Sequence, residues 1–114
     1  MTEFFDTLET RSQAEREADL FARLPDILRK AMQAPAYAAR MDGIDPDEIS
    51  SREALARLPI LRKSELPALQ KTSMPFGGFV PGPTEAFGRL FTSPGPIFEP
   101  EGAQADPWRS ARPL

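Results

Sequence analysis

The residues with the clearest chemical potential form a short loop of small side chains: Thr92, Ser93, Pro94, Gly95 and Pro96. Backbone amides and hydroxyl groups in such a loop can bind a phosphate group when several N–H donors converge. The two prolines remove two of those donors, and no lysine accompanies the hydroxyls. The same residues also fit an ordinary proline-rich turn, so the loop alone leaves both interpretations open.

Two other features have a ligand-binding interpretation and a plain structural one. Gly77 and Gly78 could permit close approach of a ligand, but a loop that needs positive φ explains them as well. Trp108 could stack on a cation beside Arg109, and simple packing of a large apolar ring is the alternative. Neither feature indicates catalysis.

Two pairs of charged residues also stand out. Arg62 and Lys63 form a compact basic pair, and Glu99 and Glu101 form a close carboxylate pair that could hold a divalent cation. Solvated surface charge explains both pairs without a ligand. We therefore assign no metal ligand and no catalytic residue from the sequence.

The composition excludes several kinds of chemistry. The chain has no cysteine and no histidine, so a general base must be a carboxylate or come from elsewhere. With 14 basic and 17 acidic side chains the formal net charge is −3, which argues against nucleic acid as a partner. The N-terminus has early acids and no apolar run, and no stretch approaches a membrane span. We expect a cytoplasmic location and no membrane partner.

The length and the proline content limit the architecture. A chain of 114 residues can bury one core, and folding would remove roughly two-thirds of its unfolded surface from water. Charged residues make up 27% and hydrophobic ones 40%, which is typical of a globular chain. Of the 13 prolines, seven fall within residues 75–107. Because proline breaks helices, the C-terminal third is predicted to lack long ones.

The N-terminal part carries the strongest helix signal. Ser12 followed by Glu15 has the form of a capping box, which predicts a helix beginning near Gln13. Apolar residues then recur at three- and four-residue steps as far as Met32, so one helix face is predicted to be buried. Pro25 interrupts this run and predicts a split or a strong kink.

Three short helices are predicted after it. Pro35 suits the first turn of a helix over residues 36–41, which places Tyr37 and Met41 on one side. Ser50 with Glu53 forms a second capping box, opening a helix over residues 52–57 with Leu55 and Leu58 facing inward. Ser64 is predicted to cap a third helix over residues 65–70, and Leu66 and Leu69 are its apolar anchors.

The rest of the chain favours loop and strand. Residues 74–83 alternate turn formers with large apolar side chains, which predicts an ordered loop packed by Phe76 and Phe79. Residues 87–92 and 97–99 have strand-forming composition and can pair across the turn between them. The final residues 106–114 read as the start of a further helix.

Four ordered strings resemble the opening of phenylacetate–CoA ligase family proteins, which belong to the adenylate-forming, AMP-binding superfamily. They are ETRSQAEREADLFARLP, DEISSREALARLPILRKSEL, MPFGGF and RLFTSPGPIFEPEG, and together they span most of residues 5–108. Each string is modest alone. Their order and spacing carry the resemblance, and LARLP with RKSEL and SPGPIFEPEG are its most diagnostic parts.

The resemblance implies an enzyme that activates an aryl acid with ATP and Mg²⁺ and transfers the acyl group to coenzyme A, releasing AMP and diphosphate. In that family a Ser/Thr/Gly-rich loop ending in lysine follows a strand, and Thr92, Ser93 and Gly95 fall where that loop would lie. The resemblance therefore implies these three as nucleotide-binding residues. Pro94, Pro96 and the missing lysine depart from the family pattern, so tight binding of any cofactor is not expected.

The predicted fold class is an α+β fragment, with N-terminal helices followed by a proline- and glycine-rich loop and short strands. It divides into a helical region 1–73 and a loop-and-strand region 74–114, which together form one incomplete domain. The resemblance implies that this fragment belongs to the large α/β domain of a ligase and is inactive alone. The remaining chain of the ligase would then be its partner. The alternative is a small stand-alone helical module that binds another protein surface.

Overall fold

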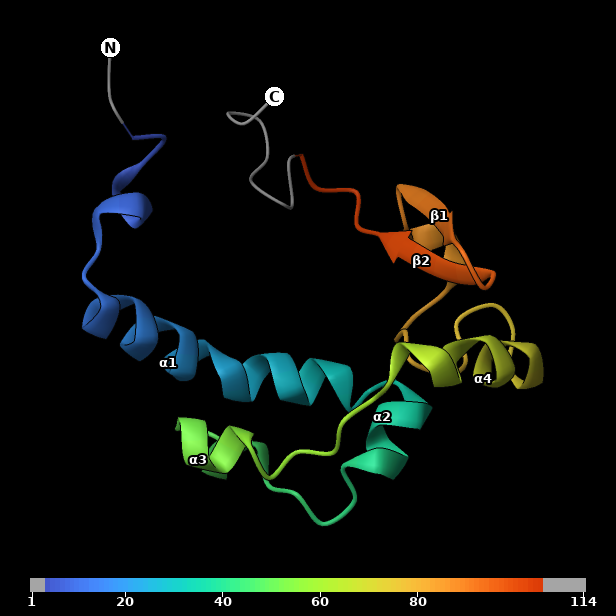
Figure 1. The fold of residues 1–114 in the computed structure, drawn as a ribbon, viewed down its shortest axis with the longest axis horizontal. Helices are drawn as coiled ribbons and strands as arrows, with labels where there is room; N and C mark the ends of the chain where they lie inside the picture. The colour runs from blue at the N-terminus through green and yellow to red at the C-terminus, as the bar shows by residue number, and fades with distance from the viewer. Residues whose placement is uncertain (1–3, 106–114) are drawn as a thin grey trace.

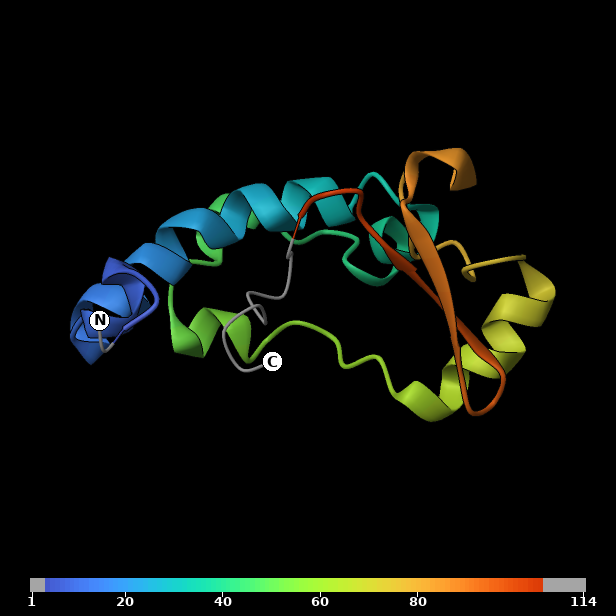
Figure 2. The ribbon, with the colours of Figure 1, turned by 90° about the horizontal axis from the view of Figure 1, so that it is seen from above.

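The computed structural model describes residues 4–105 and contains helices followed by one antiparallel hairpin (Figures 1 and 2). The fold is the predicted α+β fragment. The α-helices of the described part are α1 Gln13–Ala31, α2 Pro35–Arg40, α3 Arg52–Leu55 and α4 Leu66–Thr72, and its strands are β1 Arg89–Ser93 and β2 Ile97–Glu101. Short 3₁₀ turns connect them: η1 Thr7–Thr10, η2 Pro46–Glu48, η3 Lys63–Glu65 and η4 Thr84–Ala86. The expected helix start at 106–114, with Trp108, lies outside the described residues.

Helix α1 begins as predicted but is not broken at Pro25. Ser12 and Glu15 form both halves of the capping box, and the helix then runs from Gln13 to Ala31 with Pro25 inside it (Figure 1). A prolyl ring has a φ compatible with a helix, but it removes the hydrogen bond to the carbonyl of Phe21 and crowds that carbonyl. Residues on both sides of Pro25 pack against one apolar cluster. The predicted split at Pro25 is therefore wrong, because packing outweighs the lost bond, and the alternative of a strong kink stays a prediction.

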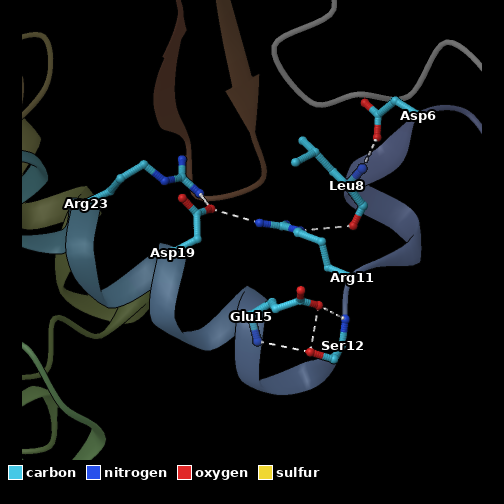
Figure 3. A network of polar contacts seen from close by, with 7 residues as sticks. All are labelled: Asp6, Leu8, Arg11, Ser12, Glu15, Asp19 and Arg23. Atoms are coloured by element: carbon cyan, nitrogen blue, oxygen red, sulfur yellow. Dashed lines mark hydrogen bonds and ion pairs between the residues drawn. The ribbon is translucent and has the colours of Figure 1, made fainter.

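A polar network fixes the first turns of α1 (Figure 3). The Glu15 amide donates to Ser12 Oγ at 3.2 Å, and the Ser12 amide donates to Glu15 Oε2 at 2.8 Å. Arg23 and Arg11 both donate to Asp19 Oδ2, at 2.7 and 2.9 Å. Hydrogen bonds from Ser12 hold the pKa of Glu15 below its ordinary value of 4.5. Those from Arg23 and then Arg11 hold the pKa of Asp19 below 3.8.

These two carboxylates predict a loss of stability in acid. Both are more acidic folded than unfolded, so their contribution is fully present above their ordinary pKa values and is lost as pH falls through the folded ones. We expect the free energy of unfolding, from urea denaturation at a series of pH values, to decline across that window. For the double variant Glu15→Gln with Asp19→Asn, the free energy of unfolding should decline less steeply as pH falls. For the control Glu85→Gln it should follow that of the wild type. Equal slopes for the double variant and the wild type would contradict this assignment.

The hydrophobic core lies where α1, α2 and the segment leading into α3 meet. Its buried members are Leu28, Met41, Ile49 and Ala54. The partly buried residues packed against them are Leu24, Ala31, Met32, Tyr37, Ile44 and Leu58. Tyr37 and Met41 thus share one side of α2, and Leu58 faces inward, as predicted. No large side chain of the described residues is fully enclosed, so this core is shallow.

Helix α3 differs from the prediction in its cap, length and facing. Ser51, not Ser50, is the N-cap, and its Oγ accepts from the Ala54 amide at 3.1 Å. The helix ends at Leu55 and does not extend over residues 52–57. Because each residue advances a helix by about 100°, the neighbouring Ala54 and Leu55 cannot both face the core. Ala54 is buried, whereas Leu55 is 42% exposed and was wrongly predicted to face inward.

The start of α4 also differs from the prediction. Ser64 lies inside η3 and does not cap a helix, and the Arg62 amide donates to Glu65 Oε2 at 2.8 Å. The α-helix then begins at Leu66 and carries the half-buried Leu69 as an apolar anchor, as expected.

The loop at residues 74–83 is ordered by Phe76 and Phe79, both buried as predicted. The ring of Phe79 meets Tyr37 edge-on with centroids 5.0 Å apart, and the Ala36 amide donates to the Gly78 carbonyl at 2.9 Å. Gly77 and Gly78 both have positive φ. A Cβ on Gly77 would lie 3.3 Å from the Leu69 backbone. The close approach there is made by the chain itself, which supports the structural explanation of these glycines.

The molecule is more extended than a compact domain of its length. Its radius of gyration is 16.7 Å, whereas a compact chain of this size would have about 13 Å. Figure 2 shows the hairpin and α4 at one end of the molecule and the start of α1 at the other. Across the described residues, no helix combines the length and apolar character that crossing a membrane requires.

Candidate functional site

The candidate loop, residues 92–96, forms the tip of the β1–β2 hairpin. The strands pair in antiparallel register, with Thr92 opposite Phe98 and Ser93 opposite Ile97. Gly95 has a φ of 155°, and a Cβ there would lie 2.8 Å from Ile97 Cγ1. Ile97 is only 3% exposed. Gly95 is therefore required by the turn and by the buried side chain beneath it, whether or not a ligand binds.

The two hydroxyls of the candidate loop point away from each other. Successive side chains of a strand lie on opposite faces, so Ser93 shares a face with Ile97 and Glu99, while Thr92 lies on the other. The Ser93 hydroxyl donates to Glu99 Oε1 at 3.2 Å. Thr92 is exposed. The structure thus keeps the predicted residues adjacent in the chain without bringing both hydroxyls to one point.

The backbone amides of the loop diverge as well. Phe98 directs its N–H and its carbonyl to the Gln70 side chain, so it does not exchange hydrogen bonds with the opposite Thr92. The Thr92 amide then points to the outer edge of β1, while that of Ser93 points towards β2. A phosphate group placed at either amide would not reach the other. The described residues therefore do not fit a closed nucleotide-phosphate loop, and binding by Thr92, Ser93 and Gly95 stays a prediction.

Each carboxylate of the acidic pair faces a basic side chain, and the two basic side chains come from different parts of the chain. Lys63 Nζ lies 4.0 Å from Glu99 Oε1, and Arg89 lies 3.5 Å from Glu101. Within residues 4–105 no group of three or more acidic, histidine or cysteine side chains could hold a metal ion. The structure thus supports solvated surface charge for Lys63 and Glu99, whereas the Glu101 side chain is only 11% exposed. It also brings a lysine to the loop that the local sequence lacks.

The residue that positions this hairpin is Gln70, which sequence reasoning did not identify. Its side chain is 4% exposed; its Nε2 donates to the Phe98 carbonyl at 3.0 Å, and its Oε1 accepts from the Phe98 amide at 2.9 Å. A buried polar group is tolerated when its hydrogen bonds are satisfied in this way. The available signal was its position four residues after Leu66, on the apolar face of α4.

A second candidate site is an apolar groove between α1 and α3, with a volume of about 590 Å³. Its apolar lining is Leu20, Phe21, Leu24, Ile27 and Leu55. Leu20 and Ile27 are more than half exposed. An ion pair between Arg52 and Glu17 lies at its rim. The groove offers no catalytic group along its apolar lining, and its chemistry suits packing against an apolar surface.

No protein-family model matches the sequence, and no curated protein matches it. Two solved structures of a 2-hydroxyisobutyryl-CoA ligase resemble the fold. The structure in the postadenylation state, in complex with 2-HIB-AMP, aligns with a TM-score of 0.71 and 27% sequence identity, covering 80% of this chain and 20% of the ligase. The structure with 2-HIB-AMP and CoA in the thioesterification state aligns with a TM-score of 0.70 and 27% identity, covering 82% and 21%. The chain spans about a fifth of the length of these ligases.

Proposed function

We propose that this chain is the N-terminal part of an adenylate-forming acyl-CoA ligase. The observation that carries the proposal is the structural match to a CoA ligase over 80% of the chain, at a TM-score of 0.71 and 27% identity. The ligase was solved with an acyl-adenylate, which supports the same class of intermediate for a complete enzyme containing this segment. CoA and ATP with Mg²⁺ would be its reactants.

The finer proposal is a ligase of the phenylacetate–CoA type, acting on an aryl acid in the cytoplasm. It rests on the four sequence strings alone, because the solved ligase is named for a 2-hydroxy acid and not for an aryl acid. The overall reaction would convert aryl acid, ATP and CoA to aryl-CoA, AMP and diphosphate. The hydroxyls and amides of the candidate loop diverge, so we assign the described residues no role in a reaction step that involves the nucleotide.

The partner that best fits the α1–α3 groove is the remaining chain of such a ligase. Four-fifths of the solved ligase lies outside the matched segment, so an ample surface exists to cover an apolar groove. The extended shape and the exposed Leu20, Ile27 and Leu55 agree with a piece of a larger domain. The same groove is what favours the second candidate function, a stand-alone module that binds another protein.

The adenylation assay tests whether this chain acts alone. We expect the purified 114-residue chain to release no diphosphate in an acid-dependent manner when given Mg²⁺–ATP and a panel of aryl acids including phenylacetate. The loop lacks converging donors, and catalysis requires groups complementary to the transition state. Release above that of a Ser93→Ala control would overturn this expectation.

The coding sequence after the Leu114 codon separates the two candidate functions. Ligase-like sequence continuing in any frame supports the ligase segment. A stop codon with no ligase-like sequence beyond it favours the interaction module.

A further inference from the structure

The two edges of the β1–β2 hairpin differ. On β2, which lies on the α4 side, the outward amide and carbonyl of Phe98 bind the Gln70 side chain, and Pro100 has no amide to offer (Figure 1). On β1, Leu90 and Thr92 lie opposite Pro100 and Phe98, so their amides and carbonyls also point outward. Within the part of the chain that the structure describes, no backbone hydrogen bond outside the hairpin uses these four groups of β1. The edge of β2 is therefore closed and that of β1 is open.

The side chains along the open edge are apolar and uncovered. Leu90 is 50% exposed and Phe91 is 46% exposed. Successive residues of a strand lie on opposite faces, so β1 carries an uncovered apolar side chain on each face. Its charged residue, Arg89, stands at the first position of the strand. Edges that avoid pairing usually carry central charges, a proline or a cover, and β1 has none of these among its five residues.

The open edge is complementary to itself. When two copies of β1 run antiparallel and cross at Phe91, Leu90 of each copy faces Thr92 of the other. Each such pair exchanges two hydrogen bonds, so every outward amide and carbonyl of both strands obtains a partner. Arg89 then faces Ser93, so no two like charges are opposed.

The neighbouring symmetric registers satisfy fewer of these groups. A shift towards the turn places Pro94 opposite Leu90, and a proline has no amide to donate. A shift the other way places Gly88 opposite Thr92, but the Gly88 amide already donates to the Glu101 carbonyl at 3.0 Å. The register centred on Phe91 is therefore the favoured one.

We propose that β1 is the docking edge for a second copy of this chain, which joins the two hairpins into one antiparallel sheet across a two-fold axis. The two Phe91 residues meet at the axis in a non-hydrogen-bonded pair, where Cα atoms approach to about 4.5 Å. A contact made by five residues of each copy is small, so the association is weak and concentration-dependent. The inference does not rest on the proposed ligase function, and it concerns a surface separate from the α1–α3 groove.

Sedimentation equilibrium of the purified 114-residue chain, at concentrations up to about 1 mM, tests the association. We expect the average mass to rise with concentration from 12.6 kDa towards twice that value. Phe91→Lys should weaken the association by about tenfold or more, because it removes an aromatic pair and opposes two like charges. The controls are Ile60→Lys, at a position 76% exposed, and Leu20→Lys, in the groove. Both add the same charge and should associate like the wild type.

Disulfide cross-linking tests the register. The sequence has no cysteine, so one introduced cysteine supplies the only thiol. Phe91→Cys should cross-link two copies readily under mild oxidation, because a Cα separation of about 4.5 Å suits a disulfide. Leu90→Cys is the matched control, since Leu90 is the similarly exposed neighbour on the same strand. Its counterpart would lie about 8 Å away, which is too far for a disulfide.

Each outcome decides the proposal. A mass that rises with concentration in the wild type and not in Phe91→Lys, with faster cross-linking of Phe91→Cys than of Leu90→Cys, supports it. A wild type that stays monomeric overturns it, as does association that Leu20→Lys abolishes and Phe91→Lys retains. Equal cross-linking of the two cysteine variants also overturns it. The cysteine variants keep the test decisive if Phe91→Lys does not fold.

Discussion

Replacing Gln70 with alanine should detach the β1–β2 hairpin from α4 and lower the free energy of unfolding by about 2–4 kcal/mol. The Gln70 side chain is 4% exposed and satisfies both the amide and the carbonyl of Phe98. Its removal leaves two backbone groups without their partner and opens space beneath β2. A large part of the cost is the unsatisfied peptide groups, because the desolvation penalty of each remains.

Amide hydrogen exchange measures this effect at the residue concerned. The Phe98 amide should be protected in the wild type and exchange faster in Gln70→Ala, while amides of α1 keep their protection. Lys71→Ala is the matched control, since Lys71 is the exposed neighbour of Gln70 on the same helix. Unchanged protection of Phe98 in Gln70→Ala would show that the hairpin is held by other contacts.

Several features set by neighbouring residues could be predicted from the sequence, although the caps at Ser50 and Ser64 were not among them. The Ser12 and Glu15 capping box lies within one helical turn, and both of its hydrogen bonds form. The ordered loop around Phe76 and Phe79 and the strand–turn–strand unit also follow from local residue types. Such features depend on a few consecutive side chains and little on the rest of the chain.

Features set by distant residues could not be predicted. Gln70 and Phe98 are 28 residues apart, and neither carries a local signal of the other. The lysine near the candidate loop comes from η3 and not from the loop sequence. Leu55 was predicted to be buried because its apolar side chain requires a partner, yet the described residues leave it lining an open groove. Periodicity identifies an apolar face but not the surface that covers it.

The same distinction explains how much of the candidate site the sequence revealed. Thr92, Ser93 and Gly95 were identified by type and order, and the structure does place them at one hairpin tip. The direction of each hydroxyl depends on the pairing register, which places Ser93 towards Glu99 and Thr92 on the opposite face. A shift of register by one residue would exchange the two faces. Composition alone could not decide between them.

Replacing Ile49 with alanine should destabilise the helical part by about 2–4 kcal/mol. Ile49 is 3% exposed and is one of four buried members of the core cluster. Truncation removes apolar contacts with the helices around it, and the shallow core cannot close the cavity fully. Chains of this size have total stabilities of only about 5–15 kcal/mol, so this loss is a large fraction of the whole.

Ile60→Ala provides a control with the same chemical change at a surface position. Ile60 is 76% exposed, so its truncation should change the free energy of unfolding by less than about 0.5 kcal/mol. Urea denaturation followed by helix circular dichroism compares the two variants directly. Ile49→Ala should lower the urea midpoint strongly, and Ile60→Ala should leave it near that of the wild type. Equal midpoints for the two variants would mean that Ile49 does not belong to the folded core in solution.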